Sequence, residues 1–188
     1  MVIAGRDSAH SILPLNARTE GEPLDFEIDK ITESIENADT GEPLNTLVLP
    51  VTKDDLKEIT KKNGWLFNWK FEYDQTERQV YKLVAEQELQ TIHGLVSLEE
   101  RAKHIYMHLI ENSPFNRGKD KKYLGVAGNL VAYGCKVSME YGFDGVISFH
   151  AKTALIEHYE KTLGAVHLGG GIMAIQEEDA KNLIDKYF

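Results

Sequence analysis

A turn of four small residues, Gly-Val-Ala-Gly at positions 125–128, is the stretch of this sequence best suited to hold an anion. An amphipathic run follows and predicts a helix over residues 129–141. The first N–H groups of a helix have no intrahelical partner, and the helix dipole places a positive partial charge at the same end. Small side chains also let a ligand approach the backbone closely. The turn therefore predicts a phosphate or pyrophosphate site, and the alternative is a tight turn that binds nothing.

The loop before this turn is basic and could bring further cations to a phosphate. Four side chains carry the charge: Arg117, Lys119, Lys121 and Lys122. An arginine can hold a phosphate through two hydrogen bonds, whereas a lysine acts as a point charge. Each of these residues taken singly also fits an ordinary solvated loop. The turn is not a Walker P-loop, because no Gly-Lys-Ser/Thr follows it, and it lacks the third glycine of a dinucleotide fingerprint.

The elements that would position these groups follow from hydrophobic periodicity. Strict alternation over residues 65–73 predicts a strand with five aromatic side chains on one face. Further strands are predicted at residues 45–51, 79–86, 89–98, 146–149, 166–168 and 172–175. Other helices are predicted at residues 25–37, 53–62, 153–163 and 177–187. Residues 101–112 allow either a helix or a strand. The order predicts an α+β (mixed α/β) fold with an antiparallel first half and a βαβ second half.

Length and charge limit the kind of protein. The 188 residues suffice for one domain, 1–188, in which residues 1–44 form an N-terminal extension without a clear assignment. The net charge of −9 argues against nucleic-acid and anionic-membrane partners, and it favours a cationic partner such as an amine. The single cysteine, Cys135, and the lack of a signal-like start or a long apolar run predict a cytoplasmic protein without a membrane span.

Two motifs, in the right order, resemble the GCN5-related N-acetyltransferase (GNAT) superfamily. Its signature is Arg or Gln, two residues, Gly, one residue, then Gly or Ala, and residues 122–127 read Lys-Tyr-Leu-Gly-Val-Ala. The second motif is a helix that ends in Tyr-Glu-Lys, here residues 159–161, shortly before Gly164. Lys122 replaces the usual Arg or Gln, and Lys152 stands where an Asn is common. The resemblance covers residues 105–175 and implies a strand at 105–111 and a central, mostly antiparallel mixed sheet flanked by helices.

The resemblance implies acetyl-CoA as co-substrate. The residues it places at the cofactor are Leu109, Ile110, Glu111, Arg117, Lys122, Leu124, Gly125, Val126, Ala127, Gly128, Asn129 and Lys152. Tyr159 becomes the candidate catalytic acid, which would protonate the leaving thiolate. Glu111, at the end of the central strand, is the candidate catalytic base, and the histidines at 93, 108 and 150 are alternatives by residue type. No metal is expected, because His104 and His108 have no third ligand at a telling spacing.

The leading hypothesis is an acyl-CoA-dependent N-acetyltransferase. It would move an acetyl group to an unidentified amine, on a small molecule or a peptide, by direct attack in a ternary complex. The first alternative is a catalytically inactive GNAT-fold module that binds acyl-CoA or another protein. The second is a structural domain whose small-residue turn binds nothing. The sequence leaves the oligomeric state open, and a homodimer is one assembly that it allows.

Overall fold

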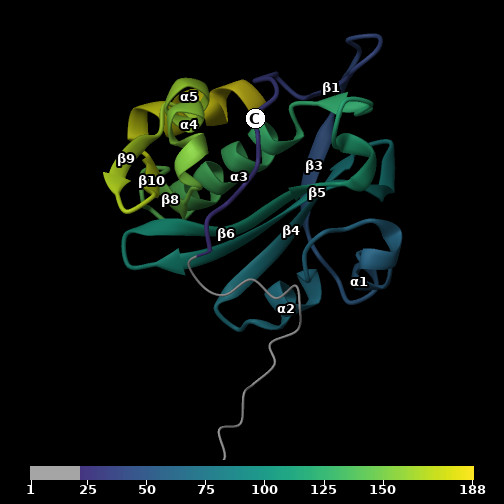
Figure 1. Ribbon diagram of the computed structural model, residues 1–188, viewed down its shortest axis with the longest axis horizontal. Coiled ribbons are helices and arrows are strands. Elements are labelled where there is room, and N and C mark those ends of the chain that lie inside the picture. Colours follow the sequence, from purple (N-terminus) through teal and green to yellow (C-terminus); the bar gives the residue numbers. More distant parts are fainter. Residues whose placement is uncertain (1–21) are drawn as a thin grey trace, which may run out of the picture.

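The computed structural model describes residues 22–188, which form two β-sheets and the helices around them (Figure 1). In this part of the chain the strands are β1 (Ile35–Asn37), β2 (Pro43–Leu44), β3 (Thr46–Pro50), β4 (Arg78–Ala85), β5 (Glu88–Arg101), β6 (His104–Asn112), β7 (Tyr123–Leu124), β8 (Ile147–His150), β9 (Val166–Gly169) and β10 (Ile172–Ile175). The α-helices are α1 (Asp55–Glu58), α2 (Trp69–Asp74), α3 (Val126–Glu140), α4 (Ile156–Leu163) and α5 (Glu177–Tyr187). Short 3₁₀ turns lie at Lys61–Asn63, Pro114–Asn116 and Thr153–Leu155.

The large sheet has seven strands in the order β3-β4-β5-β6-β8-β10-β9. All neighbours are antiparallel except β6 and β8. The parallel register of β6 with β8 covers only Ile105 with Ile147 and Tyr106 with Ser148, although β6 continues to Asn112. The carboxyl-terminal half of β6 therefore leaves β8. The mixed, mostly antiparallel sheet confirms the predicted fold class.

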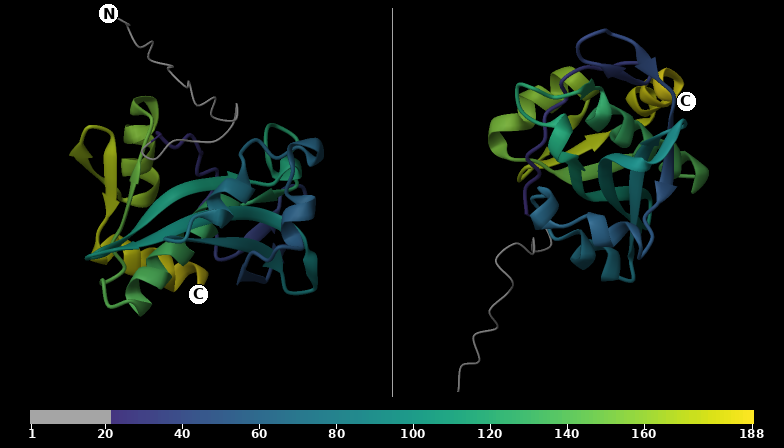
Figure 2. Two further views of the ribbon diagram at one scale, coloured as in Figure 1. Left: turned by 90° about the horizontal axis from the view of Figure 1, so that it is seen from below. Right: turned by 90° about the vertical axis from the view of Figure 1, so that its right-hand side faces the viewer.

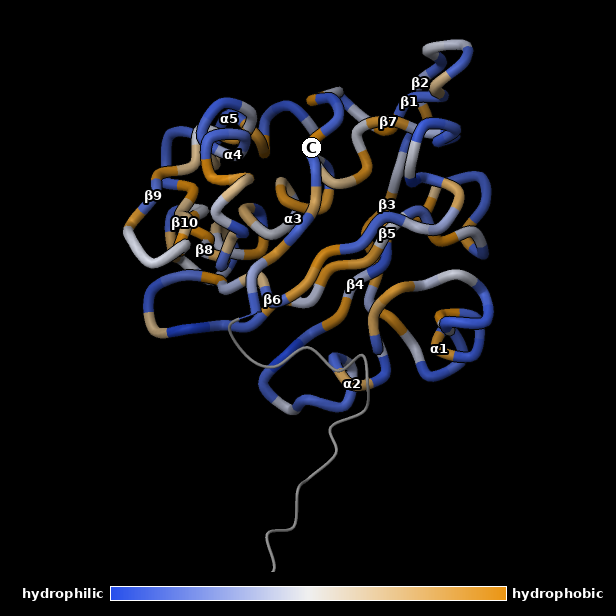
Figure 3. The backbone as a smooth tube through the Cα atoms, in the orientation of Figure 1, coloured by the Kyte–Doolittle hydropathy of each residue, from blue (hydrophilic) through white to orange (hydrophobic). Residues whose placement is uncertain are grey.

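Helix α3 lies against the middle of this sheet and forms the centre of the core. Eleven of its fifteen residues are buried, because it packs on β5 and β6 with one side and on α5 with the other. Figure 2 shows α3 and α5 on one face of the sheet and α2 and α4 on the opposite face. Hydrophobic residues are concentrated on the central strands and α3, while the surface loops are hydrophilic (Figure 3). The core thus holds the amino end of α3 rigidly beside β6.

An extended segment, residues 24–34, crosses the molecule before β1, and we call it the strap (Figure 1, purple). Leu24 forms a parallel bridge with Ala151, just after β8. The side chains of Leu24, Phe26 and Ile28 are buried, with exposed residues between them. The helix predicted for residues 25–37 is therefore wrong. Its apolar residues alternate along an extended chain, and the segment ends in β1, which pairs with β7.

The strand predicted for residues 65–73 is also wrong. Asn68 caps α2 by accepting a hydrogen bond from the N–H of Phe71 at 3.1 Å. Trp69 and Glu72, three residues apart, face inward, and Glu72 pairs with the buried Arg78. The aromatic alternation thus coincides with a turn and a short helix rather than with a sheet face.

Most other predicted elements are confirmed, including the strand at residues 105–111, with shifts of a few residues at their ends. The helix predicted at 53–62 is shorter, because α1 ends at Glu58 and a 3₁₀ turn follows. Thr52 and Asp55 bond each other reciprocally just before and at the start of α1: the N–H of Thr52 donates to the Asp55 carboxylate at 2.7 Å, and the N–H of Asp55 donates to the Thr52 hydroxyl at 3.3 Å. Residues 7–24, whose prolines, glycines and polar residues predict an irregular segment, lie almost entirely outside the described residues. No helix among residues 22–188 has the length and apolar character needed to cross a membrane.

Candidate active site

A cavity of about 260 Å³ lies where β6 separates from β8. One wall is the end of β6, with Ile110 and Glu111, and the other is the strap, with Phe26 and Glu27. Arg117, from the basic loop, closes one side. Three residues predicted at the cofactor, Ile110, Glu111 and Arg117, are therefore brought together here. The volume is below the roughly 300–1,000 Å³ of typical small-molecule pockets.

Glu111 is almost fully buried, and hydrogen-bond donors surround its carboxylate. Three of the donors are the N–H of Leu66 at 2.7 Å, the indole N–H of Trp69 at 2.6 Å and the guanidinium of Arg117 at 3.1 Å. Burial raises the pKa of Glu111 above its ordinary value, even though these donors act in the opposite direction. The N–H of Phe67 acts on Glu111 as a further donor, so about all four lone-pair sites of an ionised carboxylate are in use.

The small-residue turn lies at the amino end of α3, as predicted. Gly125 is the N-cap residue and has a φ of 85°, a conformation that favours glycine. Its N–H donates to the Oδ1 atom of Asp29 in the strap at 3.0 Å. A Cβ atom at Gly125 would collide with the hydroxyl of Thr32, also in the strap. A carboxylate of the chain itself thus binds the predicted anion site.

The rest of the turn is tightly packed. Val126, Ala127 and Gly128 are buried, and a Cβ atom at Gly128 would collide with the hydroxyl of Tyr187. Asn129 is buried too, and its amide nitrogen donates to the hydroxyl of Thr46 at 3.0 Å. That contact turns the Asn129 side chain towards β3 and away from the cavity, so a side-chain contact from Asn129 to a cofactor is not supported.

Tyr159, on α4, faces the strap from the other side. Its ring is completely buried between Phe26 and Phe149, with centroid distances of 4.7 and 5.3 Å. The hydroxyl donates to the carbonyl of Phe26 at 2.6 Å and accepts from the N–H of the same residue at 3.3 Å. Burial raises the pKa of Tyr159, with smaller contributions from Asp25 and Glu27, so the phenol stays protonated at neutral pH.

The other predicted cofactor residues are dispersed. Lys152 pairs with Asp25 of the strap, and its N–H donates to the carbonyl of Leu24 at 3.1 Å. Leu124 pairs with β1, and Lys122 is exposed at the surface. The side chain of Leu109 is buried in the core, which leaves only its backbone for a ligand.

The histidines proposed as alternative bases have other contacts. His93 packs edge-on against Phe115 and Tyr123, and burial lowers its pKa to about 4. His108 bonds the carboxylate of Glu99 at 2.5 Å. Within residues 22–188, no three His, Cys, Asp or Glu side chains gather as a metal site requires. Cys135 is buried on α3.

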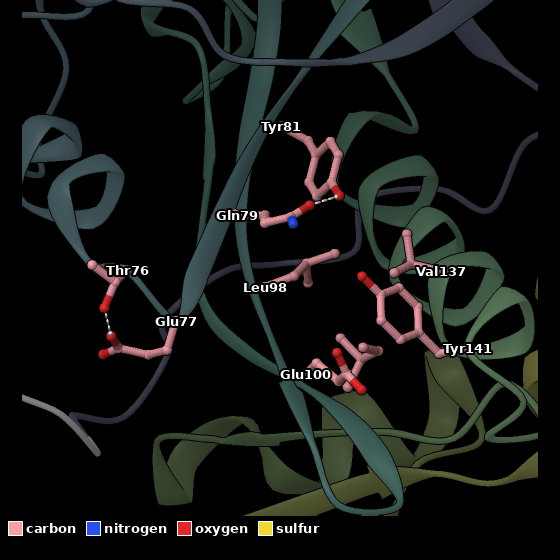
Figure 4. Close-up of a pocket in the computed structure, with 9 residues that line it drawn as sticks. Thr76, Glu77, Gln79, Tyr81, Leu98, Glu100, Val137 and Tyr141 are labelled. Carbon is pink, nitrogen blue, oxygen red and sulfur yellow. Dashed lines mark hydrogen bonds between the residues drawn. The ribbon is translucent and has the colours of Figure 1, made fainter.

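A second cavity, of about 290 Å³, lies on the α3 side of the sheet and contains none of the predicted residues. Figure 4 shows Val137 of α3 and Tyr141, the residue that caps its carboxyl end, opposite side chains of β4 and β5. Its rim carries the carboxylates of Glu77 and Glu100. We assign no role to this cavity in the site described above.

Comparisons with solved structures show proteins of the same fold. The spermidine N-acetyltransferase SpeG of Vibrio cholerae, in complex with CoA and spermine, superposes with a TM-score of 0.53 and 16% identity, over 73% of this chain and 99% of that one. A chimera of that enzyme with hSSAT gives 0.55 and 18%, over 73% and 99%. A KacTA–DNA complex gives 0.52 and 13%, over 75% and 99%. The chain therefore has the GNAT fold that its motifs resemble. No protein-family model and no curated protein sequence matches it.

The strap is the part of the candidate site that sequence reasoning missed. It contacts Gly125, Lys152 and Tyr159, which are separate parts of the predicted site. The signal was present as a strict alternation, Leu-Asp-Phe-Glu-Ile-Asp over residues 24–29, which is typical of a half-buried extended strand. Helical spacing of the later isoleucines obscured it.

Proposed function

We propose that this protein is an acyl-CoA-dependent N-acetyltransferase that moves an acetyl group from acetyl-CoA to an amine in a ternary complex. The observation that carries the proposal is that the strap bonds two predicted groups and lines the cavity at which a third lies. We call this path along the strap, from Gly125 past the cavity to Tyr159, the groove. The three groups are the N–H of Gly125, the carboxylate of Glu111 and the hydroxyl of Tyr159. Asp29 and Phe26 are three residues apart, so the anion site and the phenol lie about 10 Å apart along the strap.

Each group has a role that its chemistry supports. The N–H groups at the amino end of α3 would bind the pyrophosphate of acetyl-CoA, and Arg117 could add a cation. The phenol of Tyr159, held protonated by its raised pKa, would give its proton to the departing thiolate. Glu111, whose burial makes it more basic than an exposed glutamate, would take the proton of the attacking amine.

The acceptor is proposed to be an aliphatic amine. The similar Vibrio cholerae structure holds spermine, a polyamine. In the present chain the cavity is lined by three carboxylates, from Asp25, Glu27 and Glu111, and by two cations, Arg117 and Lys121, and the net charge of the chain is −9. A cationic acceptor would be attracted to such a surface. A homodimer stays a prediction.

The first test is release of thiol from acetyl-CoA in the presence of a panel of polyamines, diamines and peptide amines, together with calorimetry of acetyl-CoA binding. The decisive variant is Tyr159→Phe, which should lower kcat about 100-fold or more when thiol release is measured at saturating acetyl-CoA, so that a change in affinity does not enter. Tyr141→Phe, at a half-exposed tyrosine at the end of α3, is the matched control and should be fully active. Full activity of Tyr159→Phe would show that the acid is another group.

One observation favours a second candidate, a non-catalytic GNAT-fold module. The strap binds both the anion site and the phenol, so a ligand as large as acetyl-CoA does not fit the groove as the structure shows it. Acetyl-CoA binding without thiol release for any amine would support this candidate over the enzyme.

A further inference from the structure

The strap contacts the candidate active site at several separate points. It bonds the N–H of Gly125 through Asp29, the hydroxyl of Tyr159 through Phe26 and the backbone of Lys152 through Leu24. A fourth bond joins the N–H of Ile28 to the Nε2 atom of His158 at 2.9 Å. From Leu24 to Asp29 along the strap, these contacts run in order from the Tyr159 end of the groove to the small-residue turn at its other end.

The charges of the strap also match those of a phosphorylated ligand. Its residues between the buried positions are acidic: Asp25, Glu27 and Asp29. Asp25 pairs with Lys152, and the Oδ2 atom of Asp29 lies 3.1 Å from the ammonium of Lys121. The cations and N–H groups expected to meet phosphates are thus neutralised by carboxylates of the same chain.

Backbone pairing holds the two ends of the strap, whereas side-chain contacts hold its middle. After the strap, β1 pairs with β7 directly before the small-residue turn, and this register fixes one end. At the other end, in the described part of the chain, the backbone of the strap is held only by an isolated bridge, in which Leu24 bonds the carbonyl of His150 at 2.6 Å and the N–H of Lys152, so this end can detach while β1 stays paired. The middle of the strap is joined to the rest of the protein by side-chain contacts, which can exchange for those of a ligand without unfolding a sheet.

We propose that the strap is an autoinhibitory gate that competes with acetyl-CoA for the groove. The inference rests on the proposed binding of acetyl-CoA. In the closed state Asp29 occupies the anion site and Phe26 holds the phenol of Tyr159. Opening releases both groups together. The apparent dissociation constant for acetyl-CoA is then the intrinsic constant divided by the fraction of open molecules.

The first test locks the gate in the full-length chain. Leu24 and Ala151 are bridge partners, and neighbouring strands lie about 4.8 Å apart, within the range that a disulfide spans. Leu24→Cys combined with Ala151→Cys should therefore form a disulfide under oxidising conditions. The native Cys135 should not interfere, because burial raises its pKa to about 12.

Calorimetry with acetyl-CoA is then run on the oxidised and the reduced form of this double variant. The oxidised form should bind at least tenfold more weakly than the reduced form, which serves as its own folding control. Equal affinity of the two forms would overturn the gate, because a strap fixed in place would then not compete with the ligand.

A second variant acts in the opposite direction. Asp29→Ala removes the carboxylate that binds Gly125 and Lys121, and should tighten acetyl-CoA binding on the order of tenfold. It should also raise hydrogen exchange of the amides in residues 24–34. Asp39→Ala, at an exposed aspartate in the β1–β2 turn, removes the same charge and should change neither quantity. Unchanged affinity of Asp29→Ala, with faster exchange, would overturn the gate while leaving the proposed function intact.

Failure of the proposed function itself has a different signature. If acetyl-CoA binds neither the wild-type chain nor Asp29→Ala, while exchange shows that the strap has opened, the groove is not an acetyl-CoA site. That result overturns both proposals, whereas equal binding by the oxidised and reduced double variant overturns only the gate.

Discussion

Acidification should destabilise this protein through His93, and the size of the effect follows from the surroundings of its ring. The side chain is 2% exposed and lies edge-on to Phe115 and Tyr123. Its Nδ1 atom faces the amide nitrogen of Asn116 at 3.4 Å, so that a proton on Nδ1 would place two donors face to face. Burial lowers the pKa of His93 to about 4.

The sign follows from proton linkage. Between pH 6.5 and about 4 the unfolded chain binds a proton at His93 and the folded chain does not, so stability falls as the pH is lowered through this window. A separation of about 2.5 pKa units at about 1.36 kcal/mol per unit gives a loss of about 2 to 3 kcal/mol between pH 7 and pH 4.5. The part of the native fold most affected would be the loop that carries Asn116 and leads to the small-residue turn.

The assay is urea unfolding, followed by fluorescence, of the wild-type chain and of His93→Phe from pH 8 to pH 4.5. Phenylalanine keeps the ring contacts and cannot titrate, so the free energy of unfolding of this variant should fall by about 2 to 3 kcal/mol less on acidification. His167→Gln, at an exposed histidine of β9, should follow the wild type. Parallel curves for wild type and His93→Phe would refute the reasoning.

Two further predictions concern stability. Gly125→Ala should lower the melting temperature more than Gly41→Ala, because both glycines have a positive φ but only at Gly125 would an added Cβ atom meet a neighbour, Thr32. The difference in stability should be about 1 to 3 kcal/mol. Equal effects of the two substitutions would show that the strap adjusts freely to the added atom. Arg78→Met should lower the free energy of unfolding, measured with urea, by about 3 to 5 kcal/mol, because it leaves the buried carboxylate of Glu72 unpaired. Lys70→Met breaks an exposed ion pair and should lower the same free energy by less than about 1 kcal/mol.

The second half of the fold was predictable because its signals are local. The small-residue turn, the helix after it and the glycine that ends α4 each depend on residues within a few positions of one another. Gly164, for example, ends α4 in a left-handed conformation, as a glycine after a helical pattern predicts. These elements could be predicted without knowledge of any contact between residues that are distant in the sequence.

The first half was less predictable because distant contacts decide its structure. The conformation of the strap depends on Tyr159, which is 133 residues away from Phe26, and no local pattern encodes that pairing. In residues 65–73 the aromatic alternation favoured a strand, whereas Asn68 as a cap and Glu111 as acceptor for Trp69 favour the turn and helix observed. The sequence therefore predicted candidate residues, of which Ile110, Glu111 and Arg117 meet at one cavity, but it did not predict the segment that covers them.

The covalent attachment of the strap to β1 has a consequence for how this protein would respond to its ligand. An inhibitor tethered by a few residues acts at a local concentration on the order of millimolar, whatever the amount of protein present. The concentration of acetyl-CoA needed to fill the groove would then be set by the tether as much as by the groove. Substitutions in the strap could shift that threshold while every residue of the active site stays the same.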